Sequence, residues 1–413
     1  MEKLNEKIAV FGQHEEKTLK QLKDVASRAE RAAILSDGHL GYIMPIGGVA
    51  AYDSKISVAG VGFDIACGNA AIRTDLTLEQ LKPNLSELAD EIAEQISFGV
   101  GRKNKADDAP TKDPLFEDDA WNIVPKKKGV RQRLLDKART QLGTVGSGNH
   151  YVDVFADEDG AIWVGVHFGS RGFGHTVATT FMALSQGKGW GEKAKEAATI
   201  LSLDDELGKD YWAMMNLAGR YAYVGREWVA RKVVGMLGGE ELALVHNHHN
   251  FAWKEVHDGR ELVVVRKGAT PAFPGQKGFV GGSMGDNAVV LQGRDTLQES
   301  EADAKTKAAQ EAAMFSTVHG AGRVMSRTEA AGKWDYKRKV RKTAGKVSAE
   351  MMHDWLKEKE VVLRGGGLDE APHAYRRLPD VLAAQGDTVE ILHTLKPLIV
   401  VMAGANEFDP YKD

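Results

Sequence analysis

The sequence predicts a mixed fold of helices and strands around a core large enough for one big domain or two closely interleaved ones. Two observations support this prediction. The chain has 413 residues, of which 43% are hydrophobic. Segments with apolar residues at helical spacing also alternate with short apolar runs that end at glycine-rich loops. The sequence shows no internal repeat and no clear domain boundary.

The composition limits the classes of protein that need to be considered. Lys and Arg total 54 and Asp and Glu total 58, a net charge of −4, so contact with a nucleic acid would depend on a local patch. The single cysteine, Cys67, excludes an internal disulfide and leaves a buried thiol, a nucleophile or a metal ligand as its role. The charged start lacks a hydrophobic signal core, and no apolar run of about 18 residues follows, so we expect a cytoplasmic protein without membrane contact.

The N-terminal part contains two candidate site segments. A short strand is expected over 8–11 and an exposed amphipathic helix over 15–31, where apolar residues recur at three-residue steps. Segment 35–42 then sets Asp37 and His39 among glycines, which predicts either a site loop or a core strand.

A second glycine-rich segment carries a carboxylate and the only thiol, three residues apart. Asp64 and Cys67 could bind one metal ion together, and a thiolate favours a softer or borderline divalent ion.

The middle of the chain combines a helix with basic and polar stretches. We expect a helix over 76–96, then a polar connection over 102–128 that lies over a site or is mobile. The basic run 126–133 enters a helix that reaches about residue 142, and this run is either a solvated helix face or a patch for the RNA backbone.

Two histidines lie at the ends of expected strands, and a histidine cluster and His319 follow expected helices. The glycine-rich segment 143–150 places Asn149 and His150 before a strand over 151–155; such a loop resembles a nucleotide-binding loop but is weak evidence alone. His167 ends a strand over 162–167, close to Arg171. A long packed helix over 203–237 precedes the densest histidine cluster, at 244–250, and a helix over 299–313 leads to His319.

His319 stands among small residues that would give a bulky anion access to the imidazole. Gly320 and Gly322 could adopt positive φ and present N–H groups to phosphate oxygens, and Arg323 and Arg327 could donate to the same anion. For a lone histidine the alternative is a buried turn with the imidazole hydrogen-bonded to the backbone.

The basic residues that follow, with Trp334 and Tyr336 among them, form either a solvated helix or an RNA-binding surface. They are Lys333, Lys337, Arg338, Lys339, Arg341, Lys342 and Lys346.

Five residues are therefore candidate ligands for one or two divalent ions. Mixed carboxylate, thiolate and imidazole ligation suits Mn²⁺, Zn²⁺ or Fe²⁺ better than Mg²⁺ or Ca²⁺. The five are Asp64, Cys67, His150, His167 and His249.

The motifs resemble, in their order along the chain, those of the RtcB family of RNA ligases, from Asp37 to Met402. The matching motifs are Gly62-Phe63-Asp64-Ile65 with Cys67, Gly148-Asn149-His150, His167 with Gly169-Ser170-Arg171-Gly172, His249-Asn250, Arg266-Lys267-Gly268-Ala269, Gly282-Ser283-Met284-Gly285, His319-Gly320-Ala321-Gly322-Arg323 and Asp369-Glu370-Ala371-Pro372.

This resemblance implies a fold and an activity. The fold would be a single large α+β domain over 1–413 with a variable polar connection near 102–128. The activity would be RNA repair and tRNA splicing, in which an RNA 3′-phosphate or 2′,3′-cyclic phosphate end is joined to a 5′-hydroxyl end with GTP and two Mn²⁺ ions. An archease-like activator is a candidate partner.

The resemblance also implies roles for individual residues. His319 would attack the α-phosphate of GTP to form a covalent histidine–GMP, while Asp64, Cys67, His150, His167 and His249 hold Mn²⁺. Arg171, Lys267, Arg323 and Arg327 would hold RNA phosphates. The nucleotide would be held by Asn149, His150, Tyr151, Val152, Asp153, His249, Asn250, Gly281, Gly282, Ser283, Met284, His319, Gly320, Ala321 and Gly322.

Three positions depart from the family's pattern, and two other functions stay open. Asp153 stands where a glutamate is usual, Ala288 where a serine often contacts the nucleotide, and Met402 where a lysine reads guanine. A metal-dependent phosphoesterase could use the same ions to activate water. A non-catalytic RNA-binding paralogue would fit Met402 but not the intact ligand set.

Overall fold

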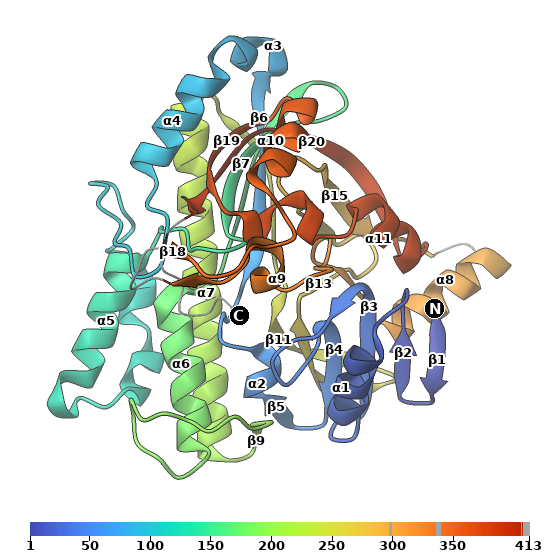
Figure 1. The fold of residues 1–413 in the computed structure, drawn as a ribbon. Coiled ribbons are helices and arrows are strands. Elements are labelled where there is room, and N and C mark those ends of the chain that lie inside the picture. Colours follow the sequence, from blue (N-terminus) through green and yellow to red (C-terminus); the bar gives the residue numbers. More distant parts are fainter. Residues whose placement is uncertain (297–299, 336–339, 406, 408–413) are drawn as a thin grey trace.

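The computed structural model, which describes residues 1–296, 300–335, 340–405 and 407, contains two large sheets (Figure 1). The six-stranded sheet has the order β1-β2-β3-β4-β12-β11 and is antiparallel except between β2 and β3. Its strands are β1 (Glu2–Asn5), β2 (Ile8–Val10), β3 (Arg31–His39), β4 (Ile46–Tyr52), β12 (Arg260–Lys267) and β11 (Asn250–His257).

The eight-stranded sheet has the order β10-β6-β8-β7-β20-β15-β14, with β19 parallel to β20. Its strands are β10 (Glu241–His248), β6 (Gly68–Thr77), β8 (Ala161–Phe168), β7 (Tyr151–Ala156), β20 (Val389–Gly404), β15 (Ala288–Gly293), β14 (Lys277–Val280) and β19 (Val362–Gly366). Three short pairs complete the strands: β5 (Lys55–Ser57) with β9 (Ile200–Ser202), β13 (Ala269–Pro271) with β16 (Ser316–Val318), and β17 (Trp334–Asp335) with β18 (Val340–Arg341).

The helices cover the sheets from outside, and α7 is the longest helix in the described part of the chain. It packs against β6 and β8 of the eight-stranded sheet and against α6 (Figure 1). The α-helices are α1 (Glu16–Ala26), α2 (Val58–Val61), α3 (Leu78–Leu81), α4 (Leu85–Gln95), α5 (Val130–Gln141), α6 (Arg171–Leu184), α7 (Glu206–Met236), α8 (Glu301–Ala312), α9 (Arg327–Ala331), α10 (Ala349–Lys359) and α11 (Leu378–Gln385). Short 3₁₀ helices are η1 (Lys82–Asn84), η2 (Pro114–Glu117), η3 (Asp119–Ile123), η4 (Lys127–Gly129), η5 (Leu368–Glu370) and η6 (Pro372–Ala374).

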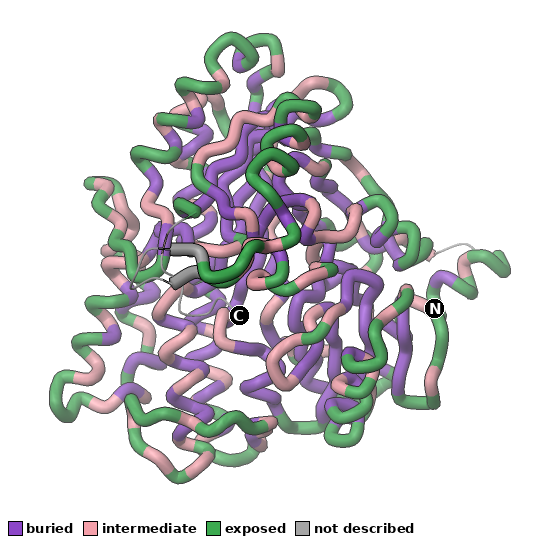
Figure 2. The backbone as a smooth tube through the Cα atoms, viewed as in Figure 1, coloured by how far each residue is buried: buried purple, intermediate pink, exposed green. Residues whose placement is uncertain are grey.

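Burial follows this architecture: the strands and the inner face of α7 are buried, whereas α1, α4 and α5 expose their outer faces (Figure 2). Two large apolar clusters meet α7, one shared with α6 and one shared with the eight-stranded sheet. The predicted α+β fold is therefore confirmed. Among the described residues, no helix is long and apolar enough to cross a membrane.

Several predicted elements differ from the structure at their ends. The helix expected over 15–31 ends at Ala26, because Arg31 already begins β3. Residues 35–39 of segment 35–42 form the end of strand β3, so Asp37 lies in a buried strand, and only residues 40–42 lie in the loop that follows. The helix expected over 76–96 is divided into α3, η1 and α4, because Pro83 cannot donate a backbone hydrogen bond to the preceding turn.

The polar connection 102–128 packs against α7 instead of lying over the site. Asp118 pairs with Arg220, and Lys232 pairs with Asp108 at 3.0 Å. Trp121, from η3, is buried in the cluster of α6 and α7. Together these contacts fix the connection on the outside of the helices.

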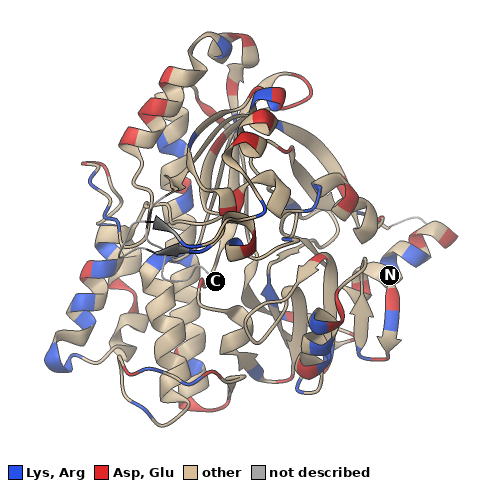
Figure 3. Ribbon diagram, in the orientation of Figure 1, with Lys and Arg blue, Asp and Glu red and all other residues tan. Residues whose placement is uncertain are grey.

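The two basic runs differ in how well the structure defines them. Near α5, where the ribbon of Figure 3 is blue at several Lys and Arg positions, Arg131 donates to the carbonyl oxygens of Val124 and Asn122. In the second run, Lys337, Arg338 and Lys339 lie outside the described residues, and Lys346 pairs with Glu329. Whether either run holds RNA stays a prediction.

Candidate active site

A cavity of about 800 Å³ is lined by residues of both large sheets. The six-stranded sheet contributes the ends of β3, β4, β11 and β12, and the eight-stranded sheet contributes β6, β7, β8 and β20. Because strand ends and the loops beyond them converge here, residues far apart in sequence face one volume.

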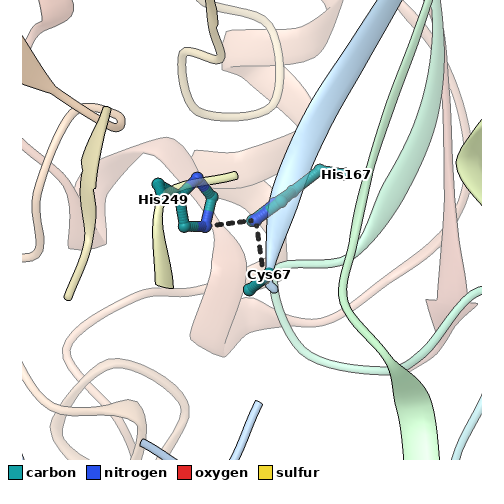
Figure 4. A group of neighbouring side chains, drawn as sticks. All are labelled: Cys67, His167 and His249. Atoms are coloured by element: carbon teal, nitrogen blue, oxygen red, sulfur yellow. Dashed lines mark hydrogen bonds between the residues drawn. The ribbon is translucent and has the colours of Figure 1, made fainter. Parts of the chain in front are cut away.

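Cys67, His167 and His249 form a first group of buried side chains whose candidate ligand atoms all lie within 4.8 Å of one another (Figure 4). The Cys67 sulfur is 3.3 Å from Nε2 of His167, and that nitrogen is 3.4 Å from Nε2 of His249. Cys67 immediately precedes β6, His167 lies near the end of the adjacent strand β8, and His249 stands between β10 and β11.

Asp64, Cys67 and His150 form a second group within the same 4.8 Å limit. Nε2 of His150 is 3.1 Å from Oδ2 of Asp64 and 3.6 Å from the Cys67 sulfur. Cys67 belongs to both groups, so a single thiolate could bridge two ions.

The protonation of these residues suits a cation at the first group. His167 Nδ1 is 2.8 Å from the carbonyl oxygen of Asn149, which only accepts, so Nδ1 carries the proton and the Nε2 lone pair faces Cys67. Burial lowers the pKa of His167 and of His249 well below the usual value, which keeps both rings neutral. Burial also raises the pKa of the Cys67 thiol, and a bound cation would be the agent that deprotonates it.

The second group would need a rearrangement to bind an ion. Arg171, which only donates, lies 3.2 Å from Nδ1 of His150, so Nε2 of His150 carries the proton and donates to Asp64. Burial opposes ionisation of Asp64, but the hydrogen bonds from His150 and Cys67 and the nearby charges of His150 and Arg171 together outweigh it, and the pKa falls to about 2. Binding an ion at His150 Nε2 would therefore displace this proton and break the Arg171 contact.

His319 faces the cavity from the loop after β16, and Asp37 orients it. Nδ1 of His319 is 2.6 Å from Oδ2 of Asp37, and the same oxygen accepts the backbone N–H of His319 at 3.0 Å. Asp37 is fully buried, whereas the His319 side chain is 15% exposed. With the proton held at Nδ1, the Nε2 lone pair is free for attack, and the ring centroid lies 5.0 Å from that of His249.

The loop around His319 requires glycine at one of the two predicted positions. Gly322 has φ of +72°, and a Cβ there would overlap the carbonyl oxygen of Asp37. Gly320 does not adopt positive φ, so that prediction was wrong, and a Cβ there would make only an ordinary contact, 3.5 Å from the carbonyl oxygen of Gly281. An absent Cβ at Gly281 likewise leaves room for the hydroxyl of Tyr151.

One part of the cavity is lined largely by apolar side chains of the neighbouring strands β7 and β20. Tyr151 and Met402 are register partners on these strands and pack in one cluster with Met284. Asp153 also lines the cavity; its Oδ1 has no hydrogen-bond partner, and burial raises the pKa of its carboxyl group.

Val152, predicted to hold the nucleotide, and Ala288, which departs from the family's pattern, face away from this part of the cavity. Side chains alternate along β7, so Val152, between Tyr151 and Asp153, points into the core of the eight-stranded sheet and does not line the cavity. Ala288 is fully buried against Phe279 in a different cluster, so its side chain also does not reach the cavity.

The predicted phosphate-binding cations already have partners. Arg323 donates to the hydroxyl of Tyr375 at 2.8 Å and to the carbonyl oxygen of Asp369 at 2.7 Å. Arg327 pairs with Asp369 at 3.2 Å and with Glu370. A phosphate approaching these arginines would meet donors that are held in place by carboxylates.

Lys267 is the most buried of the predicted phosphate-binding cations that line the cavity. Its ammonium donates to the carbonyl oxygen of Tyr42 at 2.6 Å, and burial lowers its pKa to about 7. Arg171 is not among the lining residues.

The structure thus brings most predicted site residues to one cavity, and their roles stay predictions. Asn250 spans two loops: its Oδ1 accepts the N–H of Gly268 at 2.7 Å and its Nδ2 donates to the Asp64 carbonyl at 3.4 Å. The predicted residues that line the cavity are Asp64, Cys67, Asn149, His150, Tyr151, Asp153, His167, His249, Asn250, Lys267, Gly281, Gly282, Ser283, Met284, His319, Gly320, Ala321, Gly322, Arg323 and Arg327.

Sequence reasoning did not assign a role to Asp37, nor to the carboxylate Glu370 or to Tyr375 beside the arginines. The position of Asp37 among glycines was a signal for a site. Its partner could not be found from that signal, because His319 is 282 residues away.

Comparison with known proteins places the chain among RNA-joining enzymes. The family model described as tRNA-splicing ligase RtcB matches residues 18–403. The chain is 32% identical over 394 residues to the RNA-splicing ligase RtcB of Escherichia coli strain K12, covering 89% of each chain. It is 31% identical over 417 residues to the tRNA-splicing ligase RtcB of Archaeoglobus fulgidus, covering 84% of this chain and 82% of that one. Identity to the tRNA-splicing ligase RtcB of Thermococcus kodakarensis is 29% over 451 residues, with 89% and 87% covered.

Proposed function

Because this chain belongs to the RtcB family of tRNA-splicing ligases, we propose that it joins RNA 3′-phosphate or 2′,3′-cyclic phosphate ends to 5′-hydroxyl ends, with GTP and Mn²⁺ as cofactors. The observation that supports this proposal is one oriented imidazole beside two groups of side chains that could bind metal ions, all in a single cavity.

In the first step, Nε2 of His319 attacks the α-phosphorus of GTP. A phosphorus–nitrogen bond forms, the bond to the leaving pyrophosphate breaks, and the imidazole becomes cationic. The buried carboxylate of Asp37, 2.6 Å from Nδ1, stabilises that charge. Divalent ions held by Asp64, Cys67, His150, His167 and His249 would neutralise phosphate charge.

Two further transfers complete the reaction. An oxygen of the RNA 3′-phosphate attacks the phosphorus of the bound GMP, and His319 leaves as a neutral imidazole. The 5′-hydroxyl oxygen of the second strand then attacks the RNA 3′-phosphorus, releases its proton to solvent, and displaces GMP. A cyclic phosphate end must first be hydrolysed to a 3′-phosphate.

The test is a ligation assay with two labelled RNA strands, one with a 3′-phosphate and one with a 5′-hydroxyl end. With GTP and Mn²⁺ we expect a joined strand, and none without either cofactor. Removal of the 3′-phosphate without joining would instead indicate a metal-dependent phosphoesterase, and binding without any change in the RNA would indicate a non-catalytic paralogue.

We expect Met402→Lys to sharpen the preference for GTP over ATP. The apolar part of the cavity offers Met402 where a charged donor to guanine is expected. Lys396 cannot replace that donor because it pairs with Glu360 at 3.2 Å and does not line the cavity, and Lys412 lies outside the described residues. One charge-assisted hydrogen bond would add at most about 1.5 to 3 kcal/mol of discrimination.

The measurement is the ratio of His319 labelling rates with GTP and with ATP, in the parent and in Met402→Lys. Met402→Leu serves as the matched control, because it changes shape without adding a donor. A parent that labels only with GTP, together with a variant that is no more selective, would show that another residue reads the base.

RNA binding should depend on pH through Lys267. Its folded-state pKa is lowered to about 7, so its ammonium is protonated below that pH and neutral above it. If Lys267 holds a phosphate, affinity for RNA should fall by roughly tenfold or more as pH rises from about 6 to 8.5, since a charged hydrogen bond is lost. A bound phosphate would itself raise the pKa and move this transition upward.

Fluorescence anisotropy with a non-reactive RNA measures this profile. Lys267→Arg keeps the charge at every pH used, so its profile should be nearly flat. Parallel profiles for the parent and for Lys267→Arg would exclude Lys267 as the titrating contact.

A further inference from the structure

Arg226 is a fully buried cation in the middle of α7, on the side that faces the eight-stranded sheet. Among the residues that the structure describes, no carboxylate forms an ion pair with its guanidinium. Burying a charge without a paired counter-charge destabilises the fold, so the presence of Arg226 here suggests that its hydrogen bonds have a specific role.

The guanidinium contacts the sequence neighbour of each member of the first metal group. Nη1 donates to the carbonyl oxygen of Ala66 at 2.8 Å and to that of Phe168 at 2.6 Å. Nη2 lies 2.8 Å from Nδ1 of His248. Ala66 precedes Cys67, Phe168 follows His167 and His248 precedes His249, so one side chain joins the three segments that carry the ligands.

The backbone at Ala66 supports this interpretation independently. Ala66 has φ of +60°, a left-handed conformation that costs a residue with a Cβ roughly 1 to 2 kcal/mol. Its N–H donates to the carbonyl oxygen of Asn250 at 2.7 Å, while its own carbonyl oxygen accepts from Arg226. These two contacts hold the turn that presents Cys67 to both metal groups.

Arg226 is itself held rigidly. Its Nε donates to Nε2 of His246 at 2.8 Å, and Nδ1 of that ring faces Glu227 at 3.4 Å. The Tyr223 ring stacks on His248 with centroids 3.9 Å apart. The fork of donors therefore has a fixed direction, which a flexible cation would lack.

We propose that Arg226 is a positioning residue of the metal site, which sets the distances between Cys67, His167 and His249 without touching the ions. The inference rests on the proposed function only in requiring that these three residues bind a divalent ion. It predicts that the geometry of the fork, and not the charge alone, determines metal affinity.

The test uses Co²⁺ as the probe, because a cobalt–thiolate bond absorbs light and reports contact with Cys67 directly. Arg226→Met removes all the donors, and Arg226→Lys keeps the charge but loses the fork. Partners that orient metal ligands typically contribute 10- to 100-fold in affinity, so we expect both variants to bind Co²⁺ at least about tenfold more weakly and with altered thiolate absorption.

Arg266→Met is the matched control, because Arg266 is also fully buried but contacts Glu255, Ser316 and the Met314 carbonyl, none of which adjoins a metal ligand. Thermal unfolding of the parent and of each variant defines a temperature at which all of them are folded, and the Co²⁺ titrations are made at that temperature. We expect the control to lose stability yet bind Co²⁺ like the parent.

Folded Arg226 variants that bind within twofold of the parent would overturn the proposal, and so would an equal loss of affinity in Arg266→Met. If Arg226→Met fails to fold, Arg226→Lys decides by the same criteria. Failure of the parent protein itself to bind Co²⁺ would overturn the metal site on which both the proposed function and this proposal rest. Failure of the Arg226 proposal alone differs from that result, because the parent then binds Co²⁺ and the folded variants bind it equally well.

Discussion

Replacing Cys67 with alanine should abolish ligation by removing metal from both groups of ligands. The Cys67 sulfur lies 3.3 Å from Nε2 of His167 and 3.6 Å from Nε2 of His150, so it is the one side chain that the two groups share. Loss of a shared ligand should weaken Mn²⁺ binding by more than the 10- to 100-fold that is typical of residues that only orient ligands.

Equilibrium dialysis with Mn²⁺ measures this effect apart from activity. Cys67→Ser is the matched control, because a hydroxyl of similar size can still donate an oxygen to Mn²⁺, and we expect it to retain part of the affinity. Unchanged Mn²⁺ affinity in Cys67→Ala would remove Cys67 from the metal site and leave it as a buried packing residue.

Asp37→Asn should slow formation of the covalent nucleotide by up to about 10⁴-fold, the size of effect seen when the carboxylate that orients a catalytic histidine becomes an amide. The asparagine amide can donate to Nδ1 of His319, which would place the ring proton on Nε2, the atom that must attack. It would also withdraw the negative charge that stabilises the phosphorylated imidazole.

The rate of labelling by GTP measures this effect, and Mn²⁺ affinity supplies the control. Asp37→Asn should bind Mn²⁺ like the parent, because Asp37 belongs to neither ligand group. A labelling rate within about tenfold of the parent, or a parallel loss of metal, would show that Asp37 acts as part of the fold and not on His319.

Much of the fold could be predicted because its signals are local. The apolar spacing of α7 and the short apolar runs of β7 and β8 identified these elements from the sequence. The helix expected over 76–96 failed at Pro83, and a local signal was present there too, because proline ends a helical hydrogen-bond ladder.

The site was predictable where residue chemistry alone points to a role, and not where a role depends on tertiary contacts. Cys67 and the histidines stood out as ligand types among glycines. By contrast, the bond from Asp37 to His319 joins residues 282 apart, and the contacts of Arg226 reach three different segments. Val152, predicted to hold the nucleotide, turns its side chain into the core of the eight-stranded sheet, because the phase of strand β7 becomes visible only in the packed sheet.

The most direct test of the proposed mechanism is to look for GMP on His319. The protein is incubated with GTP and Mn²⁺, and the mass of the intact chain and of its peptides is measured, with His319→Asn as the control. We predict one GMP per chain, located on the peptide that contains His319, and no adduct in the variant. A parent that binds Mn²⁺ but acquires no nucleotide would contradict the account, and hydrolysis of RNA phosphate ends by that same preparation would assign the cavity to a phosphoesterase.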